Sequence, residues 1–361
     1  MDMPKEEITV GVVLPMSGRH ELSFGYPIHR TLQIALREVN DSKLTRTKLK
    51  FIYEDDQSTV EGAINAYNKL IHEDNVSIIL GPTTSSATKE TFPIAQENQV
   101  LAISPTSAAR GLSAIGDFVF RIALTTDVLV PNGIEKTHAI LGYKKVATLY
   151  DETDEFSKDG EKAVQEKLAA INVEVLTSET FQGGSDTDFS DQLTRINELN
   201  PDAIFVSSLP GEKPEILLKG HELGITAPFI IRTLTDAEVE AAGEAAEGVI
   251  TFVGWGSNID TPGNQAFIKE FGNCQPYEEC AVGSPGPKPN NYAARAYAAL
   301  HILAEAIENA VSTDAADIRD ALANIRDFDT ILGKFSFDEN GDAVYDPKIL
   351  IVKNGELVLF E

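Results

Sequence analysis

Short apolar runs alternate with amphipathic segments along the first hundred residues. Residues 8–14 form a continuous apolar run, which is typical of a strand buried on both faces of a parallel sheet. Residues 60–71 carry apolar side chains at helical spacing, and this pattern predicts an amphipathic helix. Further strands are predicted at 49–53, 77–80 and 100–103. Strands that alternate with helices in this way predict parallel sheets with right-handed crossovers.

The same alternation starts again near residue 125. Five more strands, separated by helical segments, are predicted at 146–150, 173–176, 203–206, 229–231 and 249–253. A chain of 361 residues also exceeds the size at which one hydrophobic core usually keeps growing. We therefore predict an α/β protein with two lobes, each built on a doubly wound parallel sheet. The second run is followed by an alanine-rich helical stretch at 290–325 and by strand-like segments at 334–337 and 349–353.

The formal net charge of −26 restricts the partners that the protein can have. A surface this acidic repels nucleic acid and anionic lipid, so we expect neither as a partner. No apolar run reaches the roughly 18 residues that a membrane-spanning helix needs, so no such helix is predicted. The first residues lack the features of a signal peptide. They indicate either a cytoplasmic protein or a sequence that starts after signal-peptide cleavage.

Motifs that carry catalytic or metal chemistry are absent from the sequence. It has no nucleophile elbow, zinc-protease, phosphate-loop or dinucleotide motif, and its six histidines are scattered without ligand spacing. We therefore expect no enzyme activity, no cofactor and no metal site. Asp338 and Asp342 bound a turn that lacks the ligand pattern of a calcium loop. The two cysteines, Cys274 and Cys280, have a spacing that suits a small disulfide loop in an oxidising compartment.

Two hydroxyl-rich loops follow neighbouring predicted strands. Residues 81–88 place Thr83, Thr84 and Ser85 between the end of a strand and the start of a helix, and residues 104–108 repeat the arrangement. Ligands bind outside the carboxyl ends of strands in open α/β sheets, and a helix N-terminus attracts anions. A small carboxylate suits these loops better than a phosphate, which usually requires a richer glycine loop or an arginine. The alternative is that the loops only cap a helix and cover the surface.

Several segments, taken in order, carry a resemblance to a known family. They are residues 8–18, 55–56, 81–85, 103–105, 150–151, 242–248 and 292–297. Together they resemble the periplasmic leucine/isoleucine/valine-binding protein family, and the resemblance spans nearly the whole chain. It implies the type I periplasmic-binding-protein fold and the solute-binding component of an ABC uptake system. It also implies a small-molecule ligand (an amino acid or organic acid), a membrane ABC permease as partner, and a periplasmic or extracellular location, with or without a lipid anchor. We expect a monomer.

The resemblance also implies that each lobe is discontinuous. In that family the chain crosses between the lobes three times, and the three crossings form a hinge on which the lobes close around the ligand. Lobe I is expected at residues 7–124 and 253–332, and lobe II at residues 125–252 and 333–361.

The family binds the carboxylate of its ligand with a hydroxyl and nearby loop groups. The resemblance assigns this hydroxyl to Ser85, in the loop that also holds Thr84. Thr106 matches a position whose backbone contacts the same carboxylate. Ala108 falls where the family often has a threonine, so one side-chain donor is missing here. The aromatic walls of the site are implied at Phe24, Phe156 and Tyr292, although Phe156 also fits a buried core residue.

Residues 230–236 depart from the relatives that bind amino acids. Those relatives have a carboxylate that pairs with the ligand ammonium, whereas Arg232 or Thr233 stands there in this chain. An arginine would repel an ammonium and favour a second carboxylate or a carbonyl group. The alternative is that Arg232 faces solvent and Asp236 pairs with the ammonium. A tyrosine expected near Ser208 is also missing, which makes that wall more apolar.

Other functions use the same fold. It serves as the ligand-sensing domain of receptors and as a cytoplasmic amide-sensing regulator, and the lack of a recognisable signal peptide favours these alternatives. A hydrolase is a third alternative, which would require turnover of the bound ligand.

Overall fold

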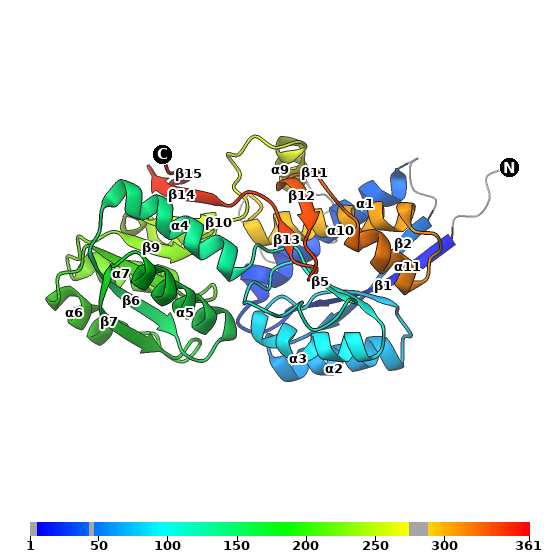
Figure 1. Ribbon diagram of the computed structural model, residues 1–361, viewed down its shortest axis with the longest axis horizontal. Coiled ribbons are helices and arrows are strands. Elements are labelled where there is room, and N and C mark those ends of the chain that lie inside the picture. The colour runs from blue at the N-terminus through cyan, green and yellow to red at the C-terminus, as the bar shows by residue number, and fades with distance from the viewer. Residues whose placement is uncertain (1–5, 43–46, 274–287) are drawn as a thin grey trace. The chain divides into compact units, whose positions relative to one another are not determined.

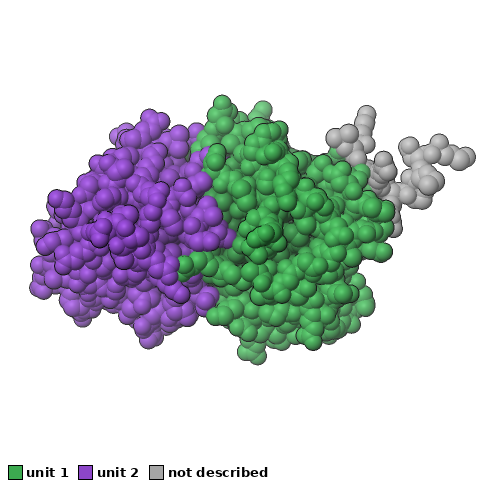
Figure 2. Space-filling view, in the orientation of Figure 1, with its two compact units in different colours: residues 1–124, 259–346 green, residues 125–258, 347–361 purple. Residues whose placement is uncertain are grey.

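The computed structural model describes residues 6–42, 47–273 and 288–361. Contacts between residues divide the chain into two compact units, which Figure 2 colours separately. Unit 1 comprises residues 1–124 and 259–346, and unit 2 comprises residues 125–258 and 347–361. In both units strands alternate with helices, so the predicted α/β class with two parallel-sheet lobes is confirmed.

Unit 1 is built on a five-stranded parallel sheet in the order β2-β1-β3-β4-β5. Its strands are β1 (Glu6–Leu14), β2 (Thr47–Asp55), β3 (Ile78–Leu80), β4 (Leu101–Ser104) and β5 (Val119–Arg121). Its helices are η1 (a π-helix, Glu21–Gly25), α1 (Tyr26–Asp41), α2 (Val60–His72), α3 (Ser85–Glu97), α9 (Asn264–Asn273), α10 (Asn291–Asn309) and α11 (Ala315–Ala323). A small antiparallel sheet contains β11 (Phe328–Thr330), β12 (Gly333–Phe337) and β13 (Ala343–Val344).

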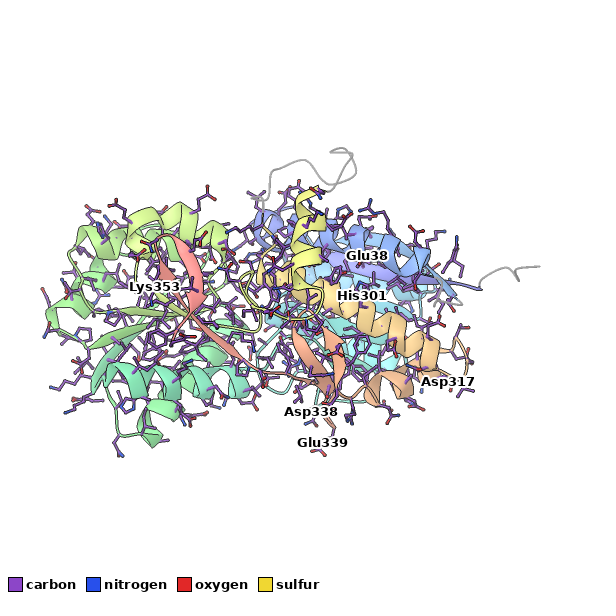
Figure 3. All side chains as sticks on the ribbon, turned by 90° about the horizontal axis from the view of Figure 1, so that it is seen from above. Glu38, His301, Asp317, Asp338, Glu339 and Lys353 are labelled. Carbon is purple, nitrogen blue, oxygen red and sulfur yellow. The ribbon has the colours of Figure 1, made fainter. Side chains whose placement is uncertain are left out.

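Helices cover both faces of this sheet, with α2 and α3 together on one face (Figure 1). This cover explains the continuous apolar run of β1, because Val10, Val12 and Val13 are fully buried. On the opposite face α1 packs along the alanine-rich α10. Glu38 of α1 and His301 of α10, labelled in Figure 3, join the two helices, with 3.1 Å between Oε2 and Nε2.

Unit 2 contains a seven-stranded sheet in the order β15-β14-β10-β9-β8-β6-β7. Its strands are β6 (Lys145–Asp151), β7 (Glu174–Phe181), β8 (Ala203–Ser207), β9 (Phe229–Arg232), β10 (Ile250–Val253), β14 (Lys348–Lys353) and β15 (Glu356–Leu359). Its helices are α4 (Thr126–Leu141), α5 (Glu155–Ala170), α6 (Ser190–Glu198), α7 (Lys213–Glu222), α8 (Asp236–Ala242) and η2 (a 3-10 helix, Gly243–Ala246). The first five strands are parallel, and β14 and β15 join antiparallel. The hairpin turn uses Asn354 and Gly355, both at positive φ, as an Asn-Gly pair predicts.

Two of the chain crossings differ from the positions expected from the sequence. The chain first leaves unit 1 after residue 124, returns after 258 rather than 252, and leaves again after 346 rather than 332. Residues 333–346 belong to unit 1 because β12 pairs with β11 and β13. Asn258 stays with unit 2, where its Nδ2 donates to the carbonyl oxygen of Leu357 over 3.0 Å. None of the helices in the described ranges is long and apolar enough to cross a membrane.

Two adjacent acids at the end of β2 have opposite environments. The carboxylate of Asp55 accepts hydrogen bonds from the amides of Met16, Ser17 and Gln57 at 2.8–3.2 Å. Asp56 is 3% exposed and accepts one amide bond, from Ser58, at 2.8 Å. Burial raises the pKa of Asp56 to about 7, with a smaller contribution from the neighbouring charge of Asp55.

We predict that Asp56→Asn stabilises the protein at pH 8 and has little effect at pH 4. The raised pKa means that the Asp56 carboxyl contributes most to folding below its ordinary pKa, and that this contribution is lost as the pH rises through about 7. Removing the charge at pH 8 should therefore raise the free energy of unfolding by about 1–3 kcal/mol. Urea unfolding at pH 4, 6 and 8 measures this, with Asp55→Asn as the control, which should destabilise. A destabilised Asp56→Asn at pH 8 would contradict the prediction.

Candidate ligand-binding site

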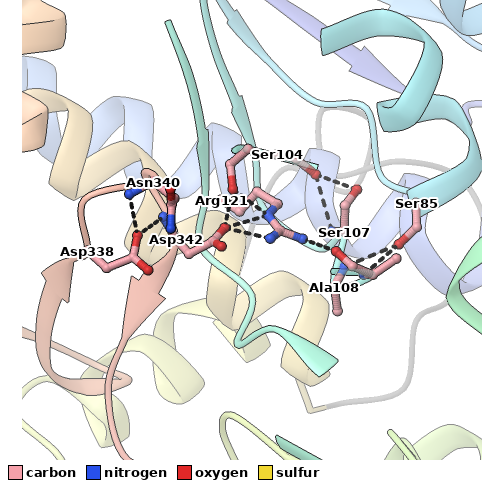
Figure 4. Close-up of polar contacts among 10 residues, drawn as sticks. Ser85, Ser104, Ser107, Ala108, Arg121, Asp338, Asn340 and Asp342 are labelled. Atoms are coloured by element: carbon pink, nitrogen blue, oxygen red, sulfur yellow. Dashed lines mark hydrogen bonds and ion pairs between the residues drawn. The ribbon is translucent and has the colours of Figure 1, made fainter. Parts of the chain in front are cut away.

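The loop between β3 and α3 presents Ser85 at the start of a helix. Thr84 caps α3, because its Oγ1 accepts a hydrogen bond from the amide of Ala87 over 3.3 Å. Ser85 is 1% exposed, and its Oγ accepts hydrogen bonds from the amides of Ala108 and Ala109, each at 3.2 Å (Figure 4). Because its oxygen is the acceptor in both bonds, its hydroxyl hydrogen is what Ser85 can donate to a ligand.

The hydroxyls of the loop after β4 join it to the first loop. Ser104 Oγ donates to the carbonyl of Pro82 over 2.7 Å, and Thr106 Oγ1 donates to the carbonyl of Thr83 over 2.5 Å. The structure therefore brings the two predicted loops together. It also commits the Thr106 side chain internally, so that its backbone is what can face a ligand. The expected contact of the Thr106 backbone with a ligand carboxylate stays a prediction, and the Thr106 side chain is engaged within the loops.

Thr83 was not singled out as a site residue by the sequence. Its side chain is 2% exposed, and its Oγ1 is buried without a hydrogen-bond partner among the described residues. An unsatisfied buried hydroxyl costs free energy, so a ligand or water that completes it is favoured. Gly81 sets the approach of this loop to β1. It has φ +117°, and a Cβ there would lie 2.3 Å from the carbonyl oxygen of Val13.

Two predicted wall residues of unit 1 lie together. Phe24, in η1, and Tyr292, in the first turn of α10, have ring centroids 4.3 Å apart and are both buried. Asn290 fixes the pair, since its Oδ1 caps α10 and its Nδ2 donates to the carbonyl of Ser23 over 3.0 Å. Unit 1 thus collects Phe24, Thr84, Ser85, Thr106, Ala108 and Tyr292 of the expected site.

In unit 2, Arg232 contacts Phe156 and Thr126. Its guanidinium carbon lies 3.9 Å from the ring centroid of Phe156. Its Nη1 donates to the carbonyl of Phe156 over 2.9 Å, and its Nη2 donates to Thr126 Oγ1 over 3.0 Å. Arg232 is 2% exposed, so the alternative in which it faces solvent is wrong.

Thr233 follows in a strained conformation. Its φ of 60° is rare for a β-branched residue. The buried Lys213 Nζ donates to the carbonyl of Thr233 over 2.6 Å and lies 3.3 Å from Glu238 Oε1. Burial lowers the pKa of Lys213, while Glu238 opposes the shift. Glu238 also completes a capping box with Thr235, so this ion pair fixes the loop before α8, where Asp236 is the first, half-buried residue.

Asp151, at the end of β6, hydrogen-bonds through only one of its two carboxylate oxygens in the described part of the chain. Its Oδ1 accepts from the amides of Thr153 and Gly183 at 2.9 and 3.1 Å. Its Oδ2 is buried without a hydrogen-bond partner in the described part of the chain, as is Ser208 Oγ. Strands β6 and β8 are adjacent, with Tyr150 opposite Ser207, so Asp151 and Ser208 end neighbouring strands.

Metal chemistry has no support in the described residues. Across residues 6–42, 47–273 and 288–361, no group of three histidine, cysteine, aspartate or glutamate side chains could hold a metal ion. Cys274 and Cys280 lie outside the described residues, so their disulfide stays a prediction.

A family comparison decides what kind of protein carries these two sets of residues. Residues 7–356 match the model of the family described as periplasmic binding protein. The chain belongs to the periplasmic binding protein family. The resemblance drawn from the sequence motifs is therefore confirmed.

Known members of this periplasmic binding protein family align over most of their length. The chain is 26% identical to Leu/Ile/Val-binding protein homolog 1 from Brucella suis, covering 93% of this chain and 87% of that protein. It is similar to the branched-chain amino acid substrate-binding protein LivJ from Streptococcus pneumoniae in complex with isoleucine (TM-score 0.87, 25% identity, 98% of both chains). It shares its fold with a solute-binding protein from R. palustris in complex with benzoate (TM-score 0.85, 22% identity, 98% of this chain and 95% of that one).

The family settles the general role. Its members are substrate-binding components of transport, so this periplasmic binding protein binds a solute and is not an enzyme. The type I fold follows from the same structural likeness.

We predict that Gly160→Ala destabilises unit 2 because no space exists for a side chain there. A Cβ at Gly160 in α5 would lie 1.9 Å from Arg232 Nη1 and 2.3 Å from Ser207 Oγ. The guanidinium would have to leave Phe156, at a cost of about 1–3 kcal/mol in the free energy of unfolding. Urea unfolding measures this, with Lys162→Ala on the exposed face of α5 as a control that should change little.

The same experiment tests the cause. In an Arg232→Met background, Gly160→Ala should lower the free energy of unfolding by less, because the guanidinium that the new side chain displaces is absent. Equal costs in both backgrounds would show that the clash with Arg232 is not the reason.

Proposed function

We propose that the chain is the extracytoplasmic solute-binding component of an ABC uptake system and binds a small carboxylate-bearing solute, an amino acid or an organic acid. The observation that carries the proposal is Ser85, at the start of α3 and in contact with the amides of Ala108 and Ala109. The periplasmic location and the partnership with a membrane permease rest on the family, and we expect the protein to act as a monomer.

The chemistry of the Ser85 loop supports a carboxylate. Helix α3 is 13 residues long and directs its positive end and its first amides toward this loop. The Ser85 hydroxyl is a donor, and the buried Thr83 hydroxyl lies two residues before it. The groups that donate to Ser85 Oγ are the backbone amides of Ala108 and Ala109, which are neutral. Neutral donors at a helix start suit a singly charged carboxylate better than a phosphate.

Aromatic residues from both units support an apolar remainder of the solute. Phe24 and Tyr292 form one buried pair, and Phe156 stacks on Arg232 in unit 2. We propose that the solute contacts Phe24 in one unit and Phe156 in the other. A ligand that contacts both units stabilises the closed state, because only in that state can it make both sets of contacts. Binding would therefore favour hinge closure.

The amino group, where the ligand has one, requires an acid in unit 2. Arg232 and Lys213 are unsuitable because both are cations. The spare, buried Oδ2 of Asp151 suits this role better than Asp236, which lies at the half-buried start of α8. One similar protein was solved with isoleucine, an amino acid, and another with benzoate, an organic acid without an amino group.

Ser85→Ala should weaken carboxylate binding. Loss of a hydrogen bond to a charged group is worth about 1.5–3 kcal/mol, so we expect affinity to fall about 10- to 100-fold. A thermal-shift screen of L-leucine, L-phenylalanine, benzoate and 4-methylpentanoate, followed by calorimetric titration of any that bind, measures this. The neighbouring variant Ser86→Ala is the control. Affinity unchanged in Ser85→Ala, or no melting-temperature increase with any compound, would count against the proposal.

Asp151→Asn separates the two ligand classes. The substitution keeps Oδ1 as an acceptor for Thr153 and Gly183 and replaces the spare oxygen with an amide nitrogen. It should lower the affinity for L-leucine about tenfold or more. The affinity for 4-methylpentanoate, which has the same carbon skeleton without the amino group, should stay nearly unchanged. Asp188→Asn, which removes a charge near the surface of unit 2, is the control. Equal losses for both compounds would exclude Asp151 as the partner of the amino group.

A further inference from the structure

Arg121 is a fully buried cation at the end of β5, shortly before the chain leaves unit 1. Its Nε donates to Asp342 Oδ1 over 2.7 Å and to Ser113 Oγ over 3.2 Å. Its Nη2 lies 2.6 Å from the same Asp342 oxygen. Its Nη1 donates to the carbonyl of Ala109. All of these groups belong to unit 1, so Arg121 is paired within a single unit.

Asp342 is presented by a tight turn that packs on β5. Asp338 Oδ1 accepts from the amides of Asn340 and Asp342, each at 2.9 Å. The amide of Arg121 donates to the carbonyl of Gly341 over 2.9 Å. Gly341 has φ +76°, and a Cβ there would lie 2.7 Å from the carbonyl oxygen of Val119, so the turn can lie this close only with glycine.

Ala109 connects this ion pair to Ser85. Its carbonyl accepts from Arg121, and its amide donates to Ser85 Oγ over 3.2 Å. Both polar groups of one residue are thus held, one by the buried cation and one by the proposed carboxylate-binding hydroxyl. The contacts form one continuous series from Asp342 through Arg121 and Ala109 to Ser85. Figure 4 labels Asp342, Arg121 and Ser85.

We infer that Arg121 and Asp342 are positioning residues, which hold the Ala108–Ala109 backbone, and through it Ser85, in the geometry that binds a ligand carboxylate. The inference rests on the proposed function in so far as Ser85 is the carboxylate-binding group. The same pair joins two stretches, 119–124 and 338–346, at which the chain leaves unit 1. The residues of this ion pair therefore lie a few positions before two of the chain crossings.

The chemistry explains why an arginine stands here. A guanidinium can direct separate N–H groups at Asp342, Ser113 and Ala109 at once, whereas a lysine ammonium cannot reproduce this planar fork. Removing Asp342 would leave the buried Arg121 without its counter-charge, which is strongly unfavourable. The guanidinium would then shift toward water and release the Ala109 carbonyl.

The experiment that needs no ligand is amide hydrogen exchange by NMR. In Asp342→Ala, and more weakly in Asp342→Asn, protection of the Ala108 and Ala109 amides should fall about tenfold or more relative to the amides of β1. Arg121→Lys should have the same effect although it keeps the charge. The control is Asp117→Ala, which removes a surface partner 2.7 Å from Arg319 and should leave Ala108 and Ala109 unchanged. Unaltered protection at Ala108 and Ala109 in Asp342→Ala overturns the inference.

Titration with L-leucine and with benzoate gives the second readout. Whichever of the two compounds binds, Asp342→Ala should lower its affinity about tenfold in the wild-type background. In a Ser85→Ala background the same substitution should lower the affinity less than about twofold. Equal losses in both backgrounds would mean that the pair only stabilises unit 1, and would overturn the positioning role. If neither compound binds the wild-type protein, the proposed function fails, while the exchange measurement still decides the inference.

Discussion

The carboxyl ends of the parallel strands in unit 1 are buried, so the protein itself has to satisfy the polar groups there. Side-chain hydroxyls provide the hydrogen bonds that these polar groups need. Ser104 and Thr106 donate to carbonyls of the loop before α3, and Ser85 accepts the amides of the next loop. Each loop therefore fixes the other. The start of α3 is therefore positioned by contacts with the neighbouring loop as well as by its own sequence.

Unit 2 meets the same constraint after β9 with a buried ion pair. Lys213 and Glu238 form a buried ion pair, and Lys213 also holds the carbonyl of Thr233. A buried charge is tolerated only when it is paired and hydrogen-bonded, so these contacts leave the loop before α8 little freedom. The strained φ of Thr233 persists because this pairing over-determines it.

The sequence predicted what depends on local periodicity and missed what depends on distant pairing. The apolar run of β1 and the helical spacing in α2 were sufficient for the α/β class, and the rule for strand ends located the Ser85 loop. The last crossing was misplaced because residues 333–346 are held in unit 1 by contacts such as that between Arg121 and Asp342, which are 221 positions apart. Nor could the sequence tell that Thr106 turns inward while Thr83 keeps a spare hydroxyl, because consecutive hydroxyls look alike until the loop is folded.

Arg232 shows how a departure from relatives can mislead when only one residue is considered. A cation where relatives have an acid suggests a reversed ligand charge, yet Arg232 donates from Nη1 to the carbonyl of Phe156 and from Nη2 to Thr126, and stacks on the Phe156 ring. This burial is possible only because Gly160 leaves the space that a side chain would fill. The arginine and the glycine therefore belong to one packing arrangement, in which Arg232 contacts both the ring and the carbonyl of Phe156. It follows that the identity of residue 232 does not by itself exclude a ligand amino group.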